Sequence, residues 1–240
     1  MPLDASKLIG TILRLQARIG ERFPSANLLS VAGDVVAAAQ QTAQRVAHVR
    51  RPQPVLRAIT WLLALAMAGV LVFFILKGKY RFEDTSGWEM MQGVEAFISS
   101  LVFLGAAMVF VITLERRVKR RRALSAIHEL RVLAHIIDMH QLDKDPDRLF
   151  RRHGPPDTTG GDTPSSPKPE LTAFELNRYL DYCAELLSLI GKISVLYSQN
   201  TDDEVILGAV DDVENLTTGL SRKIWQKIML LNSLMQGEKA

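Results

Sequence analysis

Two long apolar runs constrain this chain more than any other feature of its sequence. They are AITWLLALAMAGVLVFFIL, residues 58–76, and AFISSLVFLGAAMVFVITL, residues 96–114, and neither contains a charged residue. At about 1.5 Å rise per residue, a helix of this length reaches roughly the thickness of a bilayer's hydrocarbon core. Both runs are apolar on every side, whereas a helix on a soluble core keeps a polar face. The sequence therefore predicts two membrane-spanning helices that form a hairpin.

The distribution of Lys and Arg around the two runs predicts their orientation. Four arginines precede the first run, six basic residues follow the second, and three lie in the connecting loop, residues 77–93. Cytoplasmic flanks of membrane helices carry the excess of basic residues. We therefore expect a bacterial inner (plasma) membrane protein with two spans and both termini in the cytoplasm. The basic residues after the second run are also candidates for contacts with anionic lipid headgroups: Arg116, Arg117, Lys119, Arg120, Arg121 and Arg122.

Polar side chains are scarce inside the runs, which bears on the question of a pore. Glu95, at the edge of the second run, is the only ionisable group there, and pore-lining helices usually carry polar or charged residues. Small residues such as Gly69 and Gly105 would let helices approach closely, within the hairpin or between protomers. An oligomeric two-span channel or membrane effector is therefore the alternative to an anchor.

Composition divides the chain into five parts and indicates an all-α fold, a transmembrane hairpin with a cytoplasmic helical bundle. Net charge is about +5 over residues 1–57, about +6 over 116–153 and about −6 over 154–240, so the acidic C-terminal part could dock on the basic helix. We expect N-terminal amphipathic helices at 1–51, the hairpin at 52–115, a basic juxtamembrane helix continuing the second span at 116–142, a flexible Pro-, Gly- and Ser-rich linker at 143–169 and an antiparallel helical hairpin at 170–240.

The N-terminal part has the pattern of two amphipathic helices. One is expected over residues 4–23, where Pro24 ends it, and the next runs to about residue 51. The first helix either packs in the bundle or lies on the inner leaflet through its basic residues. Its apolar face consists of Leu8, Ile12, Leu15, Ile19 and Phe23.

The C-terminal part carries the clearest pattern of a soluble helical hairpin. Capping boxes at Thr172-x-x-Glu175 and Thr201-x-x-Glu204 each open a helix whose apolar residues recur every three or four positions. The helices at 27–51 and 117–141 could complete a four- or five-helix bundle. We expect the residues of these stripes to carry the protein's interactions, namely Leu176, Tyr179, Leu186, Ile190, Ile193, Val213, Leu220 and Ile224.

One polar cluster, at residues 128–145, contains side chains that can bind protons or metal ions. His128 and His135 share a helix face, but seven residues separate them by about 10 Å, too far for both to bind one metal ion. His135 and Asp138 are one turn apart. The favoured interpretation is a polar stripe on a half-buried helix. A pH-sensitive stripe formed by His128, His135 and Asp138 is the first alternative and a metal site the second.

No other pattern points to catalysis. The chain has no HExxH, no GxSxG and no phosphate-binding loop, and its single cysteine, Cys183, sits on a core stripe. Aromatic residues are not interleaved with the basic ones, which argues against nucleic-acid binding. We expect a non-enzymatic anchor, scaffold or regulatory subunit without a cofactor or an evident small-molecule substrate. Its expected partners are membrane lipids and either further copies of itself or a cytoplasmic protein.

Overall fold

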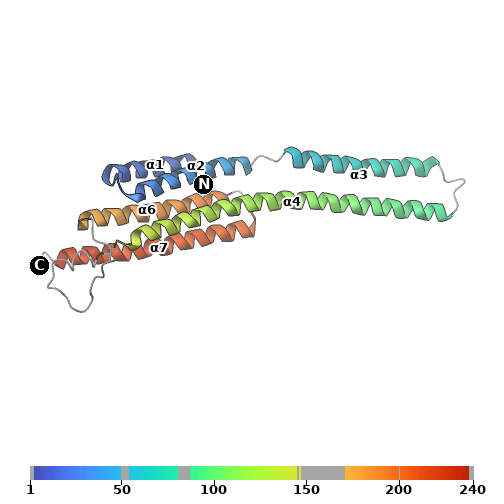
Figure 1. Cartoon of the computed structure of the whole chain (residues 1–240). Coiled ribbons are helices and arrows are strands. Elements are labelled where there is room, and N and C mark those ends of the chain that lie inside the picture. Colours follow the sequence, from blue (N-terminus) through green and yellow to red (C-terminus); the bar gives the residue numbers. More distant parts are fainter. Residues whose placement is uncertain are drawn as a thin grey trace. The chain divides into compact units, whose positions relative to one another are not determined.

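The computed structural model describes residues 3–49, 54–80, 87–144, 146, 171–199 and 201–237, and every element in these ranges is a helix (Figure 1). The all-α prediction is confirmed for this part of the chain. Two compact units separate: Val49–Arg122, which we name the apolar unit, and Met1–His48 with Ala123–Ala240, which we name the bundle unit. Apart from Asp143, Lys144 and Pro146, the expected linker at 143–169 lies outside the described residues.

The apolar unit contains α3 (Pro54–Tyr80) and the first part of α4 (Gly87–Leu142). Both helices extend into the loop expected at 77–93, which leaves only residues 81–86, outside the described ranges, to connect them. Nothing in GWEMMQG breaks a helix strongly enough to stop it, so α4 begins seven residues earlier than the polar composition suggested. The same helix continues without interruption into the bundle unit.

One helix in the described ranges, Met91–Leu142, contains a stretch long and apolar enough to cross a membrane, and none of that stretch is buried. Ala58–Phe73 of α3 is also an apolar helix, but a shorter one. The most exposed large side chains of the two helices include Leu65 at 73% and Phe103 at 76%. The hairpin of two spans stays a prediction at this point.

The bundle unit is built from five helical segments around one core. These are α1 (Ala5–Arg22), α2 (Asn27–Val49), residues 123–142 of α4, α6 (Ala173–Ser198) and α7 (Glu204–Gly237). The apolar face expected on the first helix is buried throughout, so α1 packs into the bundle. The helix expected at 117–141 also contributes to the bundle, through the buried residues Ile127, Leu130, Ala134 and Ile137 of α4.

α6 is the central helix of the bundle unit and lies between α1 and α7 (Figure 1). It is buried on nearly all sides, because Leu180, Leu187 and Leu196 widen its apolar stripe into a continuous surface. α7 packs closely against it at Gly191, where an added Cβ atom would lie 3.0 Å from Thr217 Oγ1. Gly191 therefore serves close helix packing, consistent with the absence of a phosphate-binding loop around it.

The helix starts are capped by short polar side chains. Asp4 caps α1 by accepting the Ser6 backbone N–H, and the capping box of Thr172 and Glu175 opens α6 as predicted. The second predicted box is wrong in detail. Asp203 caps α7, because its carboxylate accepts the Val205 N–H at 3.1 Å. Thr201 instead accepts the Asp203 N–H at 3.2 Å, since the helix starts two residues too late for Thr201 to act as its cap.

Candidate interaction surfaces

The residues predicted to carry interactions lie inside the bundle unit. Each is at most 5% exposed, and all belong to one continuous apolar core. Their contacts are made within the chain, so a surface for a partner must be sought on the outer faces of the helices. The residues in question are Leu176, Tyr179, Leu186, Ile190, Ile193, Val213, Leu220 and Ile224.

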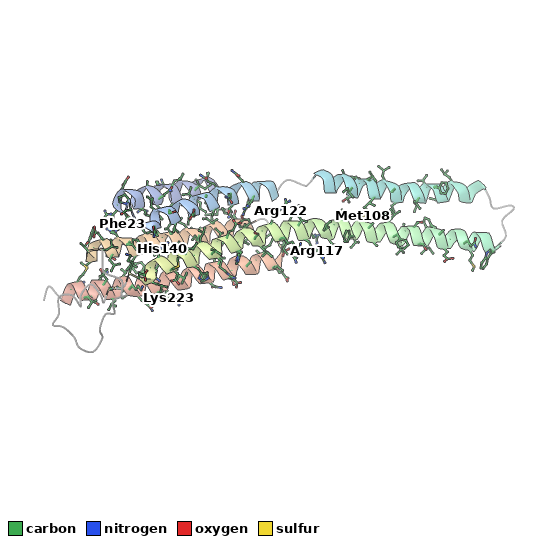
Figure 2. The ribbon with its side chains drawn as sticks, viewed as in Figure 1. Phe23, Met108, Arg117, Arg122, His140 and Lys223 are labelled. Atoms are coloured by element: carbon green, nitrogen blue, oxygen red, sulfur yellow. The ribbon has the colours of Figure 1, made fainter. Side chains whose placement is uncertain are left out.

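Aromatic side chains close one end of the core between α1 and α6. Phe23, which is labelled in Figure 2, meets the rings of Tyr179 and Tyr182 edge to face, with centroids 5.7 and 6.2 Å apart. The Arg18 guanidinium lies 5.8 Å from the centre of the Tyr182 ring and pairs with Glu185 at 2.6 Å. Such edge-to-face pairs add to the burial of apolar area and fix how the two helices meet.

A polar network ties α2, α4 and α6 together. Tyr197 donates its hydroxyl proton to Thr42 Oγ1 at 3.2 Å, and both side chains are buried. Arg45 pairs with Glu129 at 3.2 Å beside them. Burial raises the pKa of Tyr197 above its ordinary value of 10.0, so its phenol stays a hydrogen-bond donor beyond neutral pH. A buried polar group costs stability unless it is paired, so this network favours one register of the three helices.

Two polar contacts, an ion pair and a hydrogen bond, connect α7 to α4. Arg131 pairs with Asp212 at 2.9 Å, and Lys227 donates to the Gln141 backbone carbonyl at 2.9 Å. Both partners of the ion pair are at least 41% exposed, so its contribution to stability is only about 0 to 1 kcal/mol. The Lys227 contact satisfies a carbonyl near the end of α4, which a helix end requires. Lys227, which lies between the buried Ile224 and Ile228 in the sequence, therefore links two helices.

The expected polar stripe on α4 does not gather into a site. His128 and His135 are exposed, and Asp138 accepts a hydrogen bond from Gln141 Nε2 at 2.7 Å. No group of three or more His, Cys, Asp or Glu side chains in the described ranges could hold a metal ion. The pH-sensitive stripe stays an untested prediction, with its two histidines in contact with solvent.

Cys183 is fully buried in the core of the bundle unit. This burial raises the pKa of its thiol to about 12, against an ordinary value of 9.0. The thiolate, which is the nucleophilic form, is therefore suppressed at neutral pH. The side chain acts as a small apolar filler, in agreement with its position on the stripe.

The six basic residues expected to meet lipid headgroups all lie on one stretch of α4, which ends at the boundary between the units. Arg117 and Arg122, both labelled in Figure 2, are exposed, as are Arg116 and Arg121. Lys119 and Arg120 are half-buried. The helical geometry spreads these charges around the helix instead of placing them on one face.

An open groove of about 680 Å³ lies between α1, α6 and α7. Its apolar lining includes Leu3, Leu189 and Trp225, and its charged lining includes Lys7 and Asp181. Burial raises the pKa of the Asp181 carboxyl, and the nearby Arg178 guanidinium partly offsets this. The mixed charges favour no single ligand class. The groove could not be predicted from the sequence, because its three helices are brought together only by tertiary packing.

The outer face of α7 is a second surface that the sequence analysis missed. It presents Trp225 and Met229, 58% and 68% exposed, together with exposed Leu207 and the charges of Asp211, Glu214 and Arg222. The signal that could have revealed it is the presence of Trp225 and Met229 outside the buried seam. Because one face of α7 is already buried in the core, packing of the bundle does not require large apolar residues on its exposed face.

Comparisons of the chain with protein-family models, with curated proteins and with solved structures found no match.

Proposed function

We propose that this protein is a membrane-anchored, non-enzymatic scaffold or regulatory subunit that acts through its cytoplasmic helical bundle. The observation that carries the proposal is the contrast within α4. Its apolar stretch is entirely unburied, whereas residues 123–142 of the same helix contribute to a closed core. Lipid is the solvent in which such an exposed apolar helix is stable. The bundle is then the part that meets other proteins.

The proposal includes a second span formed by α3. This helix continues to Tyr80, and Ile75 and Leu76 beyond the apolar stretch are 55% and 52% exposed. Trp61 and Trp88, near the ends of the two apolar helices, are 69% and 67% exposed and suit the interfacial positions that tryptophan prefers. The basic residues before α3 and within α4 support cytoplasmic termini in a bacterial inner membrane.

Hydrogen bonding inside the apolar unit favours an anchor over a channel. Ser100 Oγ donates to the Ala96 carbonyl at 2.8 Å, and Thr113 Oγ1 donates to the Val109 carbonyl at 2.7 Å. Both hydroxyls thus satisfy themselves on their own helix, as hydroxyls in a lipid-facing helix do. A water-filled pore would instead use such groups to line its wall.

Topology reporters test the membrane part of the proposal. A fluorescent protein fused after Ala240 is expected to fluoresce. Alkaline phosphatase, which is active only outside the cytoplasm, should be inactive at Ala240 and active when inserted after Ser86. Membrane fractions washed with carbonate should retain the chain. Recovery of the chain in the soluble fraction, or an active phosphatase at Ala240, would overturn the proposed anchoring.

Purification and conductance test the scaffold part. Full-length protein purified in mild detergent is expected to appear as an oligomer or with a stoichiometric partner, and liposomes containing it should stay impermeable to ions. A strictly monomeric, partner-free chain would contradict the scaffold. Ion conductance that is lost when Gly105 is replaced by Leu would favour the channel instead.

A further inference from the structure

We propose that the outer face of α7 is a dimer interface, and that its occupant is the same face of a second copy running antiparallel. The face consists of Leu207, Asp211, Glu214, Thr218, Arg222, Trp225 and Met229, and all seven are exposed. This inference deepens the scaffold proposal by naming the partner. It does not rest on the membrane assignment, which is tested separately by the reporters above.

The spacing of these residues is symmetric about Thr218. Glu214 and Arg222 lie four positions on either side, Asp211 and Trp225 seven positions, and Leu207 and Met229 eleven positions. These steps of three and four keep all seven on one face of the helix. A two-fold axis through Thr218, perpendicular to α7, therefore brings each residue opposite its counterpart in the second copy. Isologous dimers require this kind of self-complementary patch.

The paired residues have complementary chemistry. Glu214 meets Arg222 twice across the axis, and neither has an ion-pair partner within the described residues. Asp211 meets Trp225, whose indole N–H is a hydrogen-bond donor without acceptor capacity. Leu207 meets Met229, so that apolar side chains cover one another at both ends. In a parallel pair, Glu214 would face Glu214 and Arg222 would face Arg222, and like charges disfavour that arrangement.

Small residues occupy the centre of the patch. An added Cβ atom at Gly219 would meet nothing within 4 Å, so the surface beside Thr218 is open. Thr218 and Gly219 allow two helices to cross at a short interaxial distance. With helix axes about 10 Å apart and Cα atoms about 2.3 Å from each axis, facing Cα atoms lie about 5 Å apart. That separation lies inside the range of about 4.4 to 6.8 Å for a disulfide.

The test uses cysteine crosslinking of the full-length chain in mild detergent, in a Cys183→Ala background. Thr218→Cys is expected to form a symmetric disulfide dimer under mild oxidation. His135→Cys, exposed on α4 and not part of the patch, measures crosslinking by random collision. Differently tagged Leu207→Cys and Met229→Cys chains should join through a short bis-maleimide, whereas Leu207→Cys chains should not join to each other.

Charge reversal supplies the second measurement. Arg222→Glu is expected to weaken the dimer about tenfold in analytical ultracentrifugation, because it replaces two ion pairs with two like-charge pairs. The double variant Glu214→Arg/Arg222→Glu restores complementarity and should restore the dimer. Because all these residues are exposed, helical content should stay unchanged in circular dichroism, which separates loss of pairing from loss of fold.

Three results would overturn the inference. The first is a Thr218→Cys crosslinking rate no higher than that of His135→Cys. The second is crosslinking of Leu207→Cys to itself in preference to Met229→Cys, which would indicate a parallel pair. The third is a Thr218→Cys product, formed in cells, that contains a different protein in place of the second copy.

Discussion

The apolar unit and the bundle unit treat the same kinds of side chain in opposite ways. Leu186 in α6 is fully buried, whereas Leu65 in α3 is 73% exposed. α4 belongs to both units and shows both behaviours, since Phe103 is 76% exposed and Ile137 is fully buried. The difference teaches that apolar content alone does not predict burial. A helix whose apolar residues recur every three or four positions buries that face against other helices. A helix that is apolar on all sides leaves its surface exposed to the surrounding solvent.

The largest expected effect comes from truncating leucine in each unit. Leu186→Ala should lower the free energy of unfolding of the bundle unit by about 2 to 5 kcal/mol, because it leaves a cavity in a packed core. The matched Leu65→Ala should change it by less than about 0.5 kcal/mol, since that side chain has no core around it. Denaturant unfolding of the full-length chain in detergent, followed by circular dichroism, measures both. Equal losses would remove the distinction between the units.

A charge placed on α4 should sharpen the comparison further. Phe103→Arg is expected to cost about 2.5 to 3.5 kcal/mol for insertion into the membrane, because an arginine at the centre of a span must leave water. Met139→Arg is the control, since Met139 is 57% exposed on the same helix within the bundle unit. Carbonate extraction of membranes measures insertion for both variants. Complete membrane retention of Phe103→Arg at wild-type levels would contradict the lipid-facing assignment.

Alkaline pH should destabilise the bundle unit through Cys183. The unfolded thiol loses its proton near pH 9, whereas burial raises the pKa of the folded thiol to about 12. Unfolding therefore releases a proton above pH 9, and the free energy of unfolding falls by up to about 1.4 kcal/mol per pH unit until about pH 12.

Burial also raises the pKa values of Tyr179 and Tyr197, so the tyrosines contribute to the decline as well. The comparison of the wild type with Cys183→Ala between pH 9 and 10 isolates the thiol, because both proteins keep the same tyrosines. Cys183→Ala should be less stable at pH 8 but should show a shallower decline between pH 9 and 10. An identical decline in both proteins would show that Cys183 does not cause it. Maleimide labelling of the wild type should also be slow until denaturant opens the core.

The smallest predicted effect concerns a helix end in water. Thr172→Ala should lower the free energy of unfolding by about 1 kcal/mol, because it removes the side chain that accepts the Glu175 N–H. Thr172→Ser keeps that acceptor and should restore most of the stability. Denaturant unfolding at pH 7 distinguishes the two variants. If serine is as destabilising as alanine, the capping hydrogen bond is not the cause.

The sequence was sufficient for much of the fold because helical periodicity is a local property. The stripes of α1, the end of α4 and α6 all proved buried, and Pro24 marks the break after α1. Helix starts were less certain. Thr201 and Asp203 can each cap a helix, and only the position of the first turn distinguishes them.

The candidate surfaces were harder to predict because they depend on which helices become neighbours. The stripe residues of α6, among them Leu186 and Ile190, looked equally suited to a partner and to the chain's own core. Only the packing of α1 and α7 against α6 makes them internal. The outer face of α7 follows from the same seam, because Ile224 and Ile228 lie in the core and leave Trp225 and Met229 outside it.

The central position of α6 has a consequence for synthesis on the ribosome. Arg18 of α1 meets its partner Glu185 only after a further 167 residues have been added to the chain. At about 5 to 20 residues per second that interval is roughly 10 to 30 seconds. During this time α1 and α2 have emerged with their apolar faces uncovered, while the apolar helices between them and α6 are still being made. The nascent N-terminal segment therefore cannot complete its packing until α6 has been synthesised.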